Sequence, residues 1–216
     1  MKKFNLLAVA LFATISMLFV ACSSCSHKED KKAEETVATK LIQGDRQHMK
    51  NIDRAYVYYE SCYMFEGRFD TLTTPTVVYL ENVFQVVNKE TNQPTVYIAH
   101  HDINKSSDLW ETKVGSFWLG DNDMNEYEIK LTVEEAFAKA KKSSFAKPHS
   151  RFCTLRAEVG IKACNPQYIF GNTTYGLLYV DAVTGDVSDV NPVFNNFKCI
   201  SIEKDSVRMQ KDSIDD

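Results

Sequence analysis

The sequence has 216 residues, of which 25 are Lys or Arg and 29 are Asp or Glu, giving a formal net charge of −4. A chain of this length can bury a core without help from disulfides or metals, and a hydrophobic content of 44% excludes global disorder. The acidic balance excludes a general nucleic-acid binder, because such proteins normally carry a basic surface.

The N-terminal segment predicts export. Lys2 and Lys3 precede an uncharged stretch from 4 to 26, which is strongly apolar from 6 to 20. A short basic start, an apolar run and then small residues form the layout of a secretory signal. The same stretch is also long enough to form an uncleaved membrane helix.

Residues 18–22, Leu-Phe-Val-Ala-Cys, resemble the lipobox of bacterial lipoproteins, in which a small residue precedes the Cys that is acylated and becomes the mature N-terminus. The resemblance implies a signal peptide at 1–21 and a lipid anchor on Cys22, with palmitate among its acyl chains. It also implies attachment to the outer membrane of a Gram-negative cell envelope, with the body periplasmic or surface-exposed. Several acyl chains together anchor a protein stably, whereas one chain does so only marginally.

The rest of the chain divides by composition. Residues 22–40 are polar, of mixed charge and without apolar periodicity, which predicts a flexible tether. Residues 205–216 are similarly polar and are predicted to form a disordered tail. Residues 41–204 remain for folding, and this length favours a single domain.

Strands are predicted in the first half of that body. Residues 55–65 are dense in aromatic and β-branched side chains and favour a strand, although a helix is also compatible. Residues 76–87 and 95–99 are better strands, and the turn-forming cluster at 88–94 between them predicts a hairpin. Residues 115–119 are predicted to form a further short strand.

A helix is predicted to begin after Thr132. Thr132 and Glu135 have the spacing of a capping box, in which each side chain accepts a hydrogen bond from the other residue's backbone N–H. Acidic residues in the first turn and lysines near the end complement the helix dipole. One apolar stripe follows with helical spacing, formed by Val133, Ala136, Phe137 and Ala140.

Strands resume after this helix. Apolar and β-branched runs predict strands at 152–159, 167–170 and 177–183, and a turn at 184–186 leads to a short return strand at Val187. The whole pattern predicts an α+β fold, with an antiparallel β-sheet and one main helix packed on a face.

Two segments resemble PepSY-type modules. Residues 131–140 contain Thr-Val-Glu-Glu-Ala, and residues 178–187 read Leu-Tyr-Val-Asp-Ala-Val-Thr-Gly-Asp-Val. The resemblance covers about 130–190 and implies a PepSY-like fold there. It also implies a non-catalytic binding or regulatory domain of the cell envelope, with a protein or peptide as partner, no cofactor, and peptidase inhibition as one form of the role.

Two groups of residues are candidate metal sites. On a strand, His100 and Asp102 could share one face while His101 points to the other, but a zinc site needs three or four ligands. Asp181 and Asp186 flank a turn in which Gly185 supplies a positive φ, and calcium would need several more oxygens. Structural roles are expected for both groups. Residues 121–126 begin like an EF-hand loop and then depart from it at the sixth and twelfth positions.

Four cysteines lie in the predicted body and could oxidise outside the cytoplasm. Three pairings are possible for Cys62, Cys153, Cys164 and Cys199. The preferred pairing joins Cys153 to Cys164 across a short loop and Cys62 to Cys199 across the two halves of the body.

Two further functions compete with a binding or regulatory role. A ligand-binding lipoprotein could stack glycans or peptides on an exposed groove of Trp110, Trp118 and Tyr127, although core packing of these rings is expected. A hydrolase would need His100, Asp102 or a free Cys to converge in one pocket. No serine hydrolase, zinc protease or nucleotide-binding motif occurs in the sequence.

Overall fold

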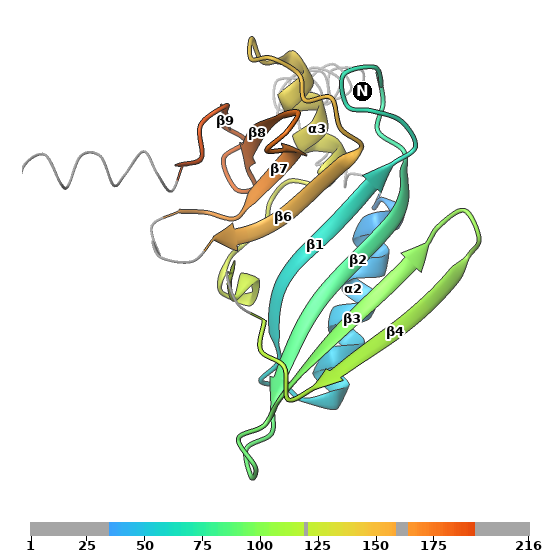
Figure 1. Ribbon diagram of the computed structural model, residues 1–216, viewed down its shortest axis with the longest axis vertical. Coiled ribbons are helices and arrows are strands. Elements are labelled where there is room, and N and C mark those ends of the chain that lie inside the picture. The colour runs from blue at the N-terminus through green and yellow to red at the C-terminus, as the bar shows by residue number, and fades with distance from the viewer. Residues whose placement is uncertain (1–34, 119–120, 159–163, 193–216) are drawn as a thin grey trace, which may run out of the picture. The chain divides into compact units, whose positions relative to one another are not determined.

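The computed structural model describes residues 35–118, 121–158 and 164–192 (Figure 1). The predicted signal peptide, Cys22, Cys199 and the tail at 205–216 lie outside these ranges. No helix within the described ranges is both long enough and apolar enough to cross a bilayer. The helices within these ranges are α2 (Val37–Ile52), the 3-10 helix η1 (Met124–Glu126) and α3 (Val133–Lys142).

In the described part of the chain nine strands form the sheet, in the order β4-β3-β2-β1-β6-β7-β8-β9, with β5 paired beside β6. Every pairing is antiparallel. The fold is therefore α+β with an antiparallel sheet, as predicted. The strands are β1 (Val57–Phe65), β2 (Val77–Val87), β3 (Pro94–Asp102), β4 (Ser107–Val114), β5 (Asp121–Asn122), β6 (Phe152–Glu158), β7 (Gln167–Asn172), β8 (Gly176–Asp181) and β9 (Val187–Ser188).

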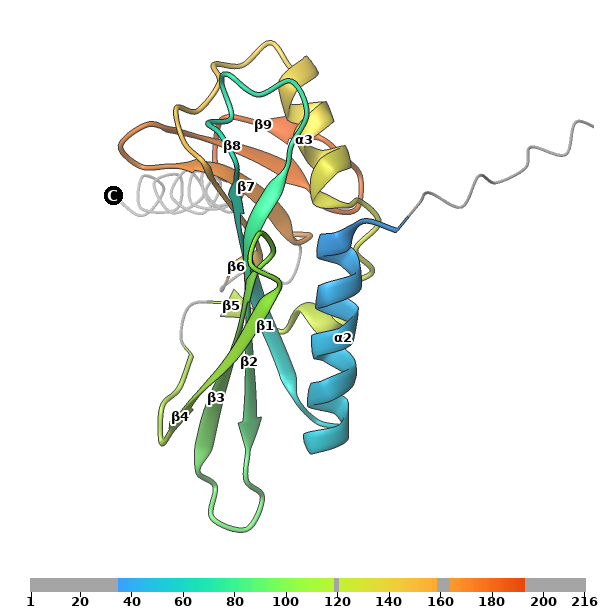
Figure 2. The same ribbon diagram turned by 90° about the vertical axis from the view of Figure 1, so that its right-hand side faces the viewer.

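The two halves of the domain repeat one succession of elements. In the first half α2 is followed by β1 to β4, and in the second half α3 is followed by β6 to β9. Because β1 pairs with β6, the halves join at the middle of one continuous sheet. Figure 2 shows α2 and α3 on the same side of this sheet. Two helices therefore cover one face, where the sequence predicted one main helix.

Helix α2 begins inside the segment that was predicted to be a tether. The side chain of Thr36 caps its first turn by accepting a hydrogen bond from the backbone N–H of Thr39. Its inner side carries apolar residues at helical spacing, interrupted by the buried Asp45. These inner apolar residues are Ala38, Leu41, Ile42 and Met49.

Helix α3 begins after Thr132, as predicted, and has the predicted capping box. The Thr132 hydroxyl accepts from the Glu135 N–H at 3.2 Å, and the Glu135 carboxylate accepts from the Thr132 N–H at 2.9 Å. All four residues of the predicted apolar stripe are buried. The Phe137 ring packs edge-on against Phe69, with ring centroids 4.7 Å apart, and also contacts Phe65 and Phe170. This aromatic group joins α3 to both halves of the sheet.

The two faces of the sheet differ in what covers them. On the helix side, side chains of both halves, from Ala38 to Ala182 in the sequence, form one buried cluster. On the opposite side a smaller cluster, made of Val83, Val96 and Ile98, is covered by Trp118. The remainder of this second face, called here the open face, carries polar and partly exposed side chains.

The predicted strands outside the 107–119 region are confirmed, including the hairpin of β2 and β3. Residues 115–118 form no strand, and the preceding segment, Ser107–Val114, forms the unpredicted strand β4. The reason is its position: an edge strand exposes most of its side chains, so Ser, Asp, Glu, Thr and Lys replace the apolar alternation that marks a buried strand.

Replacing Phe137 with Ala should lower the free energy of unfolding by about 3–5 kcal/mol, because the lost ring leaves a cavity between α3 and the sheet. Phe152 is 53% exposed, so its replacement with Ala should change the free energy of unfolding by less than about 0.5 kcal/mol. Urea denaturation followed by circular dichroism measures both variants. Equal losses in the two would contradict the packing described here.

Candidate binding surface

Strand β4 forms one end of the sheet and pairs only with β3 among the described strands. It is eight residues long, and all of its residues except Trp110 are exposed. Leu109 and Val114 are 66% and 64% exposed, which is unusual for aliphatic side chains. A long, exposed edge of this kind offers backbone donors and acceptors to an added strand.

One hydrogen bond at the end of β4 shows which of its backbone N–H groups face β3 and which face away from the sheet. The Gly115 N–H donates to the Pro94 carbonyl at 2.7 Å, next to the register pair Thr95 and Val114. Because N–H groups of an antiparallel strand alternate between its two edges, the N–H of Lys113 faces β3 and the N–H of Thr112 faces away from the sheet. Thr112 is exposed. Its N–H is thus open to an incoming strand.

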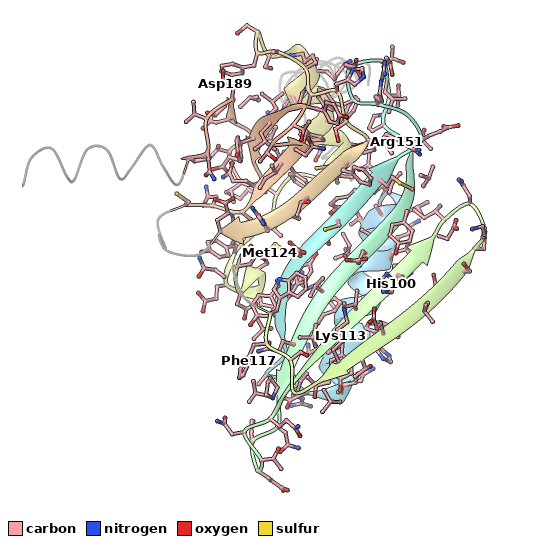
Figure 3. The ribbon with its side chains drawn as sticks, viewed as in Figure 1. His100, Lys113, Phe117, Met124, Arg151 and Asp189 are labelled. Atoms are coloured by element: carbon pink, nitrogen blue, oxygen red, sulfur yellow. The ribbon has the colours of Figure 1, made fainter. Side chains whose placement is uncertain are left out.

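The open face continues inward from this edge. Across β4, β3, β2 and β1, the register places Leu109, His100, Glu81 and Cys62 directly opposite one another in one row. Figure 3, in which α2 lies behind the sheet, shows His100 and Lys113 on this face. The His100 ring lies 2.7 Å from the Tyr79 hydroxyl and 3.1 Å from the Glu81 carboxylate. These side chains form a polar surface beside β4.

His100 and Asp102 share this face, as predicted from strand alternation. Both line a surface depression together with Tyr79, Ser107 and Leu109. Asp102 pairs instead with Lys105, at 2.7 Å, and the ion pair and its hydrogen bonds lower the pKa of that carboxyl. Within the described residues, no three His, Cys, Asp or Glu side chains are placed to hold a metal ion.

Glu60 lies at the centre of the sheet and is 8% exposed. Burial, followed by the neighbouring Asp121, raises the pKa of its carboxyl to about 7, although Arg156 opposes the rise. Arg156 donates to Glu158 at 2.9 Å, while its Nε lies 3.7 Å from Asp121 without a hydrogen bond. Burial also raises the pKa of Asp121. The carboxyl groups of Glu60, Asp121 and Glu158 thus share the guanidinium of Arg156.

The thiols of the sheet lie in environments that keep them protonated. Burial, followed by the nearby Glu60, raises the pKa of Cys62 to about 12. Burial, followed by the nearby Cys62, places the pKa of Cys153 well above its ordinary value. A reactive cysteine needs the opposite, a lowered pKa in a cationic environment.

The predicted disulfides have different outcomes. Cys153 points from β6 into the core, is 1% exposed and carries a free thiol, so the expected bond to Cys164 is not formed in this structure. Cys62 also carries a free thiol. Because Cys199 lies outside the described residues, its pairing with Cys62 stays a prediction.

A buried polar network lies on the helix side, centred on His101. Its Nε2 lies 2.8 Å from Asp45 of α2, and its Nδ1 lies 2.7 Å from Asp108 of β4. Asp45 also accepts a hydrogen bond from Asn82, which accepts in turn from Ser61. The hydrogen bond to Asp45 raises the pKa of His101, and the bond to Asp108 adds to this.

The sequence did not predict this network, because it offered no evident partner for His101. The partner comes from α2, a helix that was not predicted, and from β4, a strand that was not predicted. One signal was present: Asp45 interrupts an apolar stripe that would otherwise run without a break along one side of a helix. A carboxylate in that position is expected to need a buried partner.

The turn at Asp181 has the structural role that was expected. Its Oδ1 accepts from the backbone N–H groups of Val183 and Thr184, both at 2.8 Å, and Asn165 donates to both carboxylate oxygens. Gly185 has φ 80°, and a Cβ there would clash with the Lys139 side chain. Asp186 accepts from the Thr184 hydroxyl at 2.8 Å.

The residues of the EF-hand-like segment separate in the structure. Asp123 caps η1, and Asp121 contacts Trp118 and Arg156. The three rings proposed for a stacking groove are partly buried instead. Trp110 and Tyr127 pack against the main core, and Trp118 packs on the small cluster of the open face. They therefore form no shared exposed groove.

Comparison with known proteins adds no relative. The chain matches no known family model, no curated protein and no solved structure. The PepSY resemblance therefore remains a resemblance of two segments, which the structure places on α3 and on the β8–β9 hairpin.

Replacing Glu60 with Gln should raise the free energy of unfolding at pH 8 by up to about 3 kcal/mol and leave it nearly unchanged at pH 4. The folded-state pKa, about 7, lies above the ordinary 4.5, so the buried carboxyl stabilises the fold while protonated. This contribution is complete below about pH 4.5 and is lost as the pH rises through about 7.

Urea unfolding at intervals between pH 4 and pH 8 measures the effect. Glu128→Gln is the matched control, because that side chain is 84% exposed and should leave the pH profile unchanged. Parallel profiles for wild type and Glu60→Gln would contradict the assignment.

Proposed function

We propose that this chain is a lipid-anchored protein of a bacterial cell envelope, whose domain binds a protein or peptide partner and performs no catalysis. The partner would add an extended segment along β4 and contact the adjoining open face. A peptidase is the partner class implied by the PepSY resemblance, with inhibition or regulation as the outcome. The observation that carries the binding proposal is the long exposed edge of β4.

The edge suits a peptide for two reasons. Its outward N–H and carbonyl groups can pair with any extended backbone, which supplies affinity without demanding one sequence. Leu109 on the open face and Val114 on the helix face add apolar contacts, and Glu111 and Lys113, paired at 3.3 Å, add charges of both signs. This combination favours a peptide of mixed composition.

A binding role is also supported by the state of the nucleophiles. Cys62 and Cys153 are buried thiols of raised pKa, and Ser61 hydrogen-bonds to Asn82 rather than to His101. His100 shares a surface row with Cys62, but Glu81 stands between them. These contacts offer no activated nucleophile to a substrate on either face.

Thr112→Pro should weaken binding of the peptide partner at least tenfold, because proline removes an outward N–H of β4 while sparing the bonds to β3. Thr112→Ala keeps that N–H and should bind within about twofold of wild type. The measurement is complex formation and inhibition across a panel of envelope peptidases, with unfolding curves to confirm that both variants fold. Absence of a complex across the panel would remove the peptidase version of the proposal.

Cys22→Ala should abolish incorporation of labelled palmitate and leave residues 1–21 attached, so that the variant accumulates as the larger precursor. The lipobox resemblance makes Cys22 the acylated residue, so Cys25→Ala, three residues away, is the matched control and should be labelled and processed like the wild type. Labelling that persists in the Cys22 variant would contradict the lipid anchor.

A further inference from the structure

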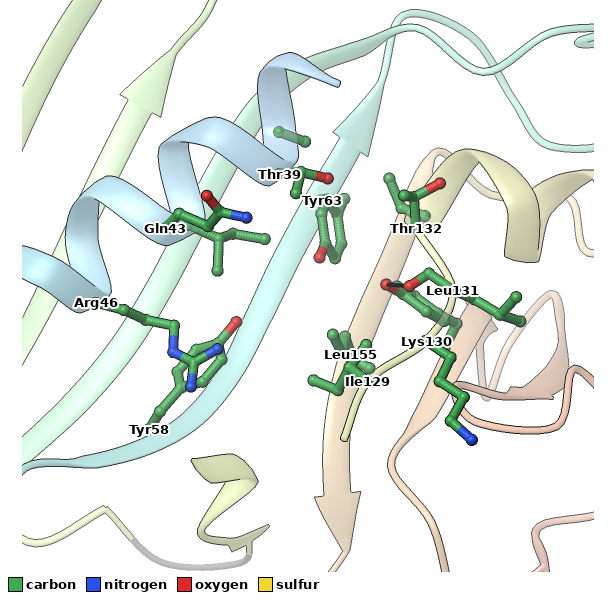
Figure 4. A pocket seen from close by; sticks show the side chains of 14 residues that line it. Thr39, Gln43, Arg46, Tyr58, Tyr63, Ile129, Lys130, Leu131, Thr132 and Leu155 are labelled. Carbon is green, nitrogen blue, oxygen red and sulfur yellow. Dashed lines mark hydrogen bonds between the residues drawn. The ribbon is translucent and has the colours of Figure 1, made fainter. Parts of the chain in front are cut away.

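A cavity of about 290 Å³ lies on the helix side, between α2 and the segment that leads into α3 (Figure 4). Its α2 wall includes Ile42, Gln43 and Arg46, and residues 129–133 form the wall opposite. Its base is made by tyrosines of the central strands together with Leu155. The cavity therefore lies where the two halves of the domain meet, away from the β4 edge.

Arg46 is the charged group of this cavity that has no counter-ion. Its Nε donates to the Tyr56 hydroxyl at 3.4 Å and its Nη2 donates to Asn125 at 3.0 Å, both neutral groups. The guanidinium lies over the Tyr58 ring, 5.6 Å from its centroid, as Figure 4 shows. Among the described residues no carboxylate forms an ion pair with it.

The remaining N–H groups of Arg46 are available to a ligand. A guanidinium has five N–H donors, and its two protein partners use two of them. The contacts to Tyr56 and Asn125 hold the group in place at the cavity, so little conformational entropy is lost when an anion binds. Lys130, the other cation of the lining, is paired weakly with Glu128 at 3.9 Å.

The rest of the lining is suited to an apolar body. Ile42, Leu131 and Leu155 contribute aliphatic surface. The Tyr168 hydroxyl donates to the Leu131 carbonyl at 2.8 Å, so it needs no hydrogen-bond acceptor from a ligand. The Tyr58 hydroxyl is likewise hydrogen-bonded to Ser61. A cavity with a mainly apolar lining and a small number of polar groups is the usual form of a small-molecule site.

We propose that this cavity binds a small amphipathic carboxylate, with its carboxylate on Arg46 and its apolar body against the aliphatic lining. The planar guanidinium matches a carboxylate, which it can bind through two parallel hydrogen bonds. Arg46 balances one negative charge, and Lys130 is already paired with Glu128, so a dianionic phosphate would bring a second charge without a counter-ion. The proposal is independent of peptide binding at β4.

The test is calorimetric titration of the full lipid-anchored chain in nanodiscs, with empty nanodiscs subtracted. Hexanoate is the probe, and it should bind with a Kd below about 1 mM, as befits a ligand of this size. Hexylammonium has the same apolar body with the opposite charge and should bind at least tenfold more weakly. This comparison needs no variant, so it does not depend on how a substitution affects folding.

Arg46→Gln should weaken hexanoate binding at least tenfold. Arg54→Gln, a change of the same kind at an exposed arginine, should leave it within about twofold. Unfolding curves confirm that both variants are folded. The proposal is overturned if hexanoate does not bind up to 10 mM, if hexylammonium binds equally well, or if folded Arg46→Gln retains wild-type affinity.

Discussion

His101 lies between Asp45 of α2 and Asp108 of β4, and this arrangement fixes α2 on the strands that it covers. The Asp45 and His101 side chains are almost fully buried, so neither can exchange its partner for water. Removing one member of such a pair leaves a buried charge or an unpaired donor, which ordinarily costs about 3–5 kcal/mol. Apolar contacts alone would let α2 slide or rotate on the sheet. The directional bonds to His101 and Asn82 select one position.

The position of α2 in turn sets the other features of the domain. It places Arg46 over the Tyr58 ring and opposite residues 129–133, so the cavity between the halves exists only with α2 in this register. Through Asp45 it also contacts His101 of β3, whose other ring nitrogen contacts Asp108 of β4, so α2, β3 and β4 share one polar network. The hydrogen bond to Asp45 raises the pKa of His101. The stabilisation from protonated His101 is therefore complete below the ordinary pKa of histidine and declines as the pH rises through the raised pKa.

Local patterns in the sequence predicted the elements that are stabilised locally. The capping box of Thr132 and Glu135, the stripe through Phe137 and the β2–β3 hairpin are each specified by residues a few positions apart. Helix α2 and strand β4 were missed for opposite reasons. The apolar stripe of α2 was not recognised because the segment around it is polar. Strand β4 lacks the alternation of apolar and polar residues because it lies exposed at the edge of the sheet. The partners of His101 depended on both, so no inspection of His100, His101 and Asp102 alone could find them.

The two ends of the sheet are unequal, and the inequality limits how copies of this protein could assemble. At one end β4 offers eight residues, whereas at the other β9 has only two among the described residues. If two copies paired through β4, the contact would be two-fold symmetric and would consume the long edge of each. The outer ends of the pair would then be two short β9 strands, which are poor templates for a third copy. Pairing of two copies through β4 would therefore favour a closed dimer over an open-ended fibre, as far as the described strands decide it.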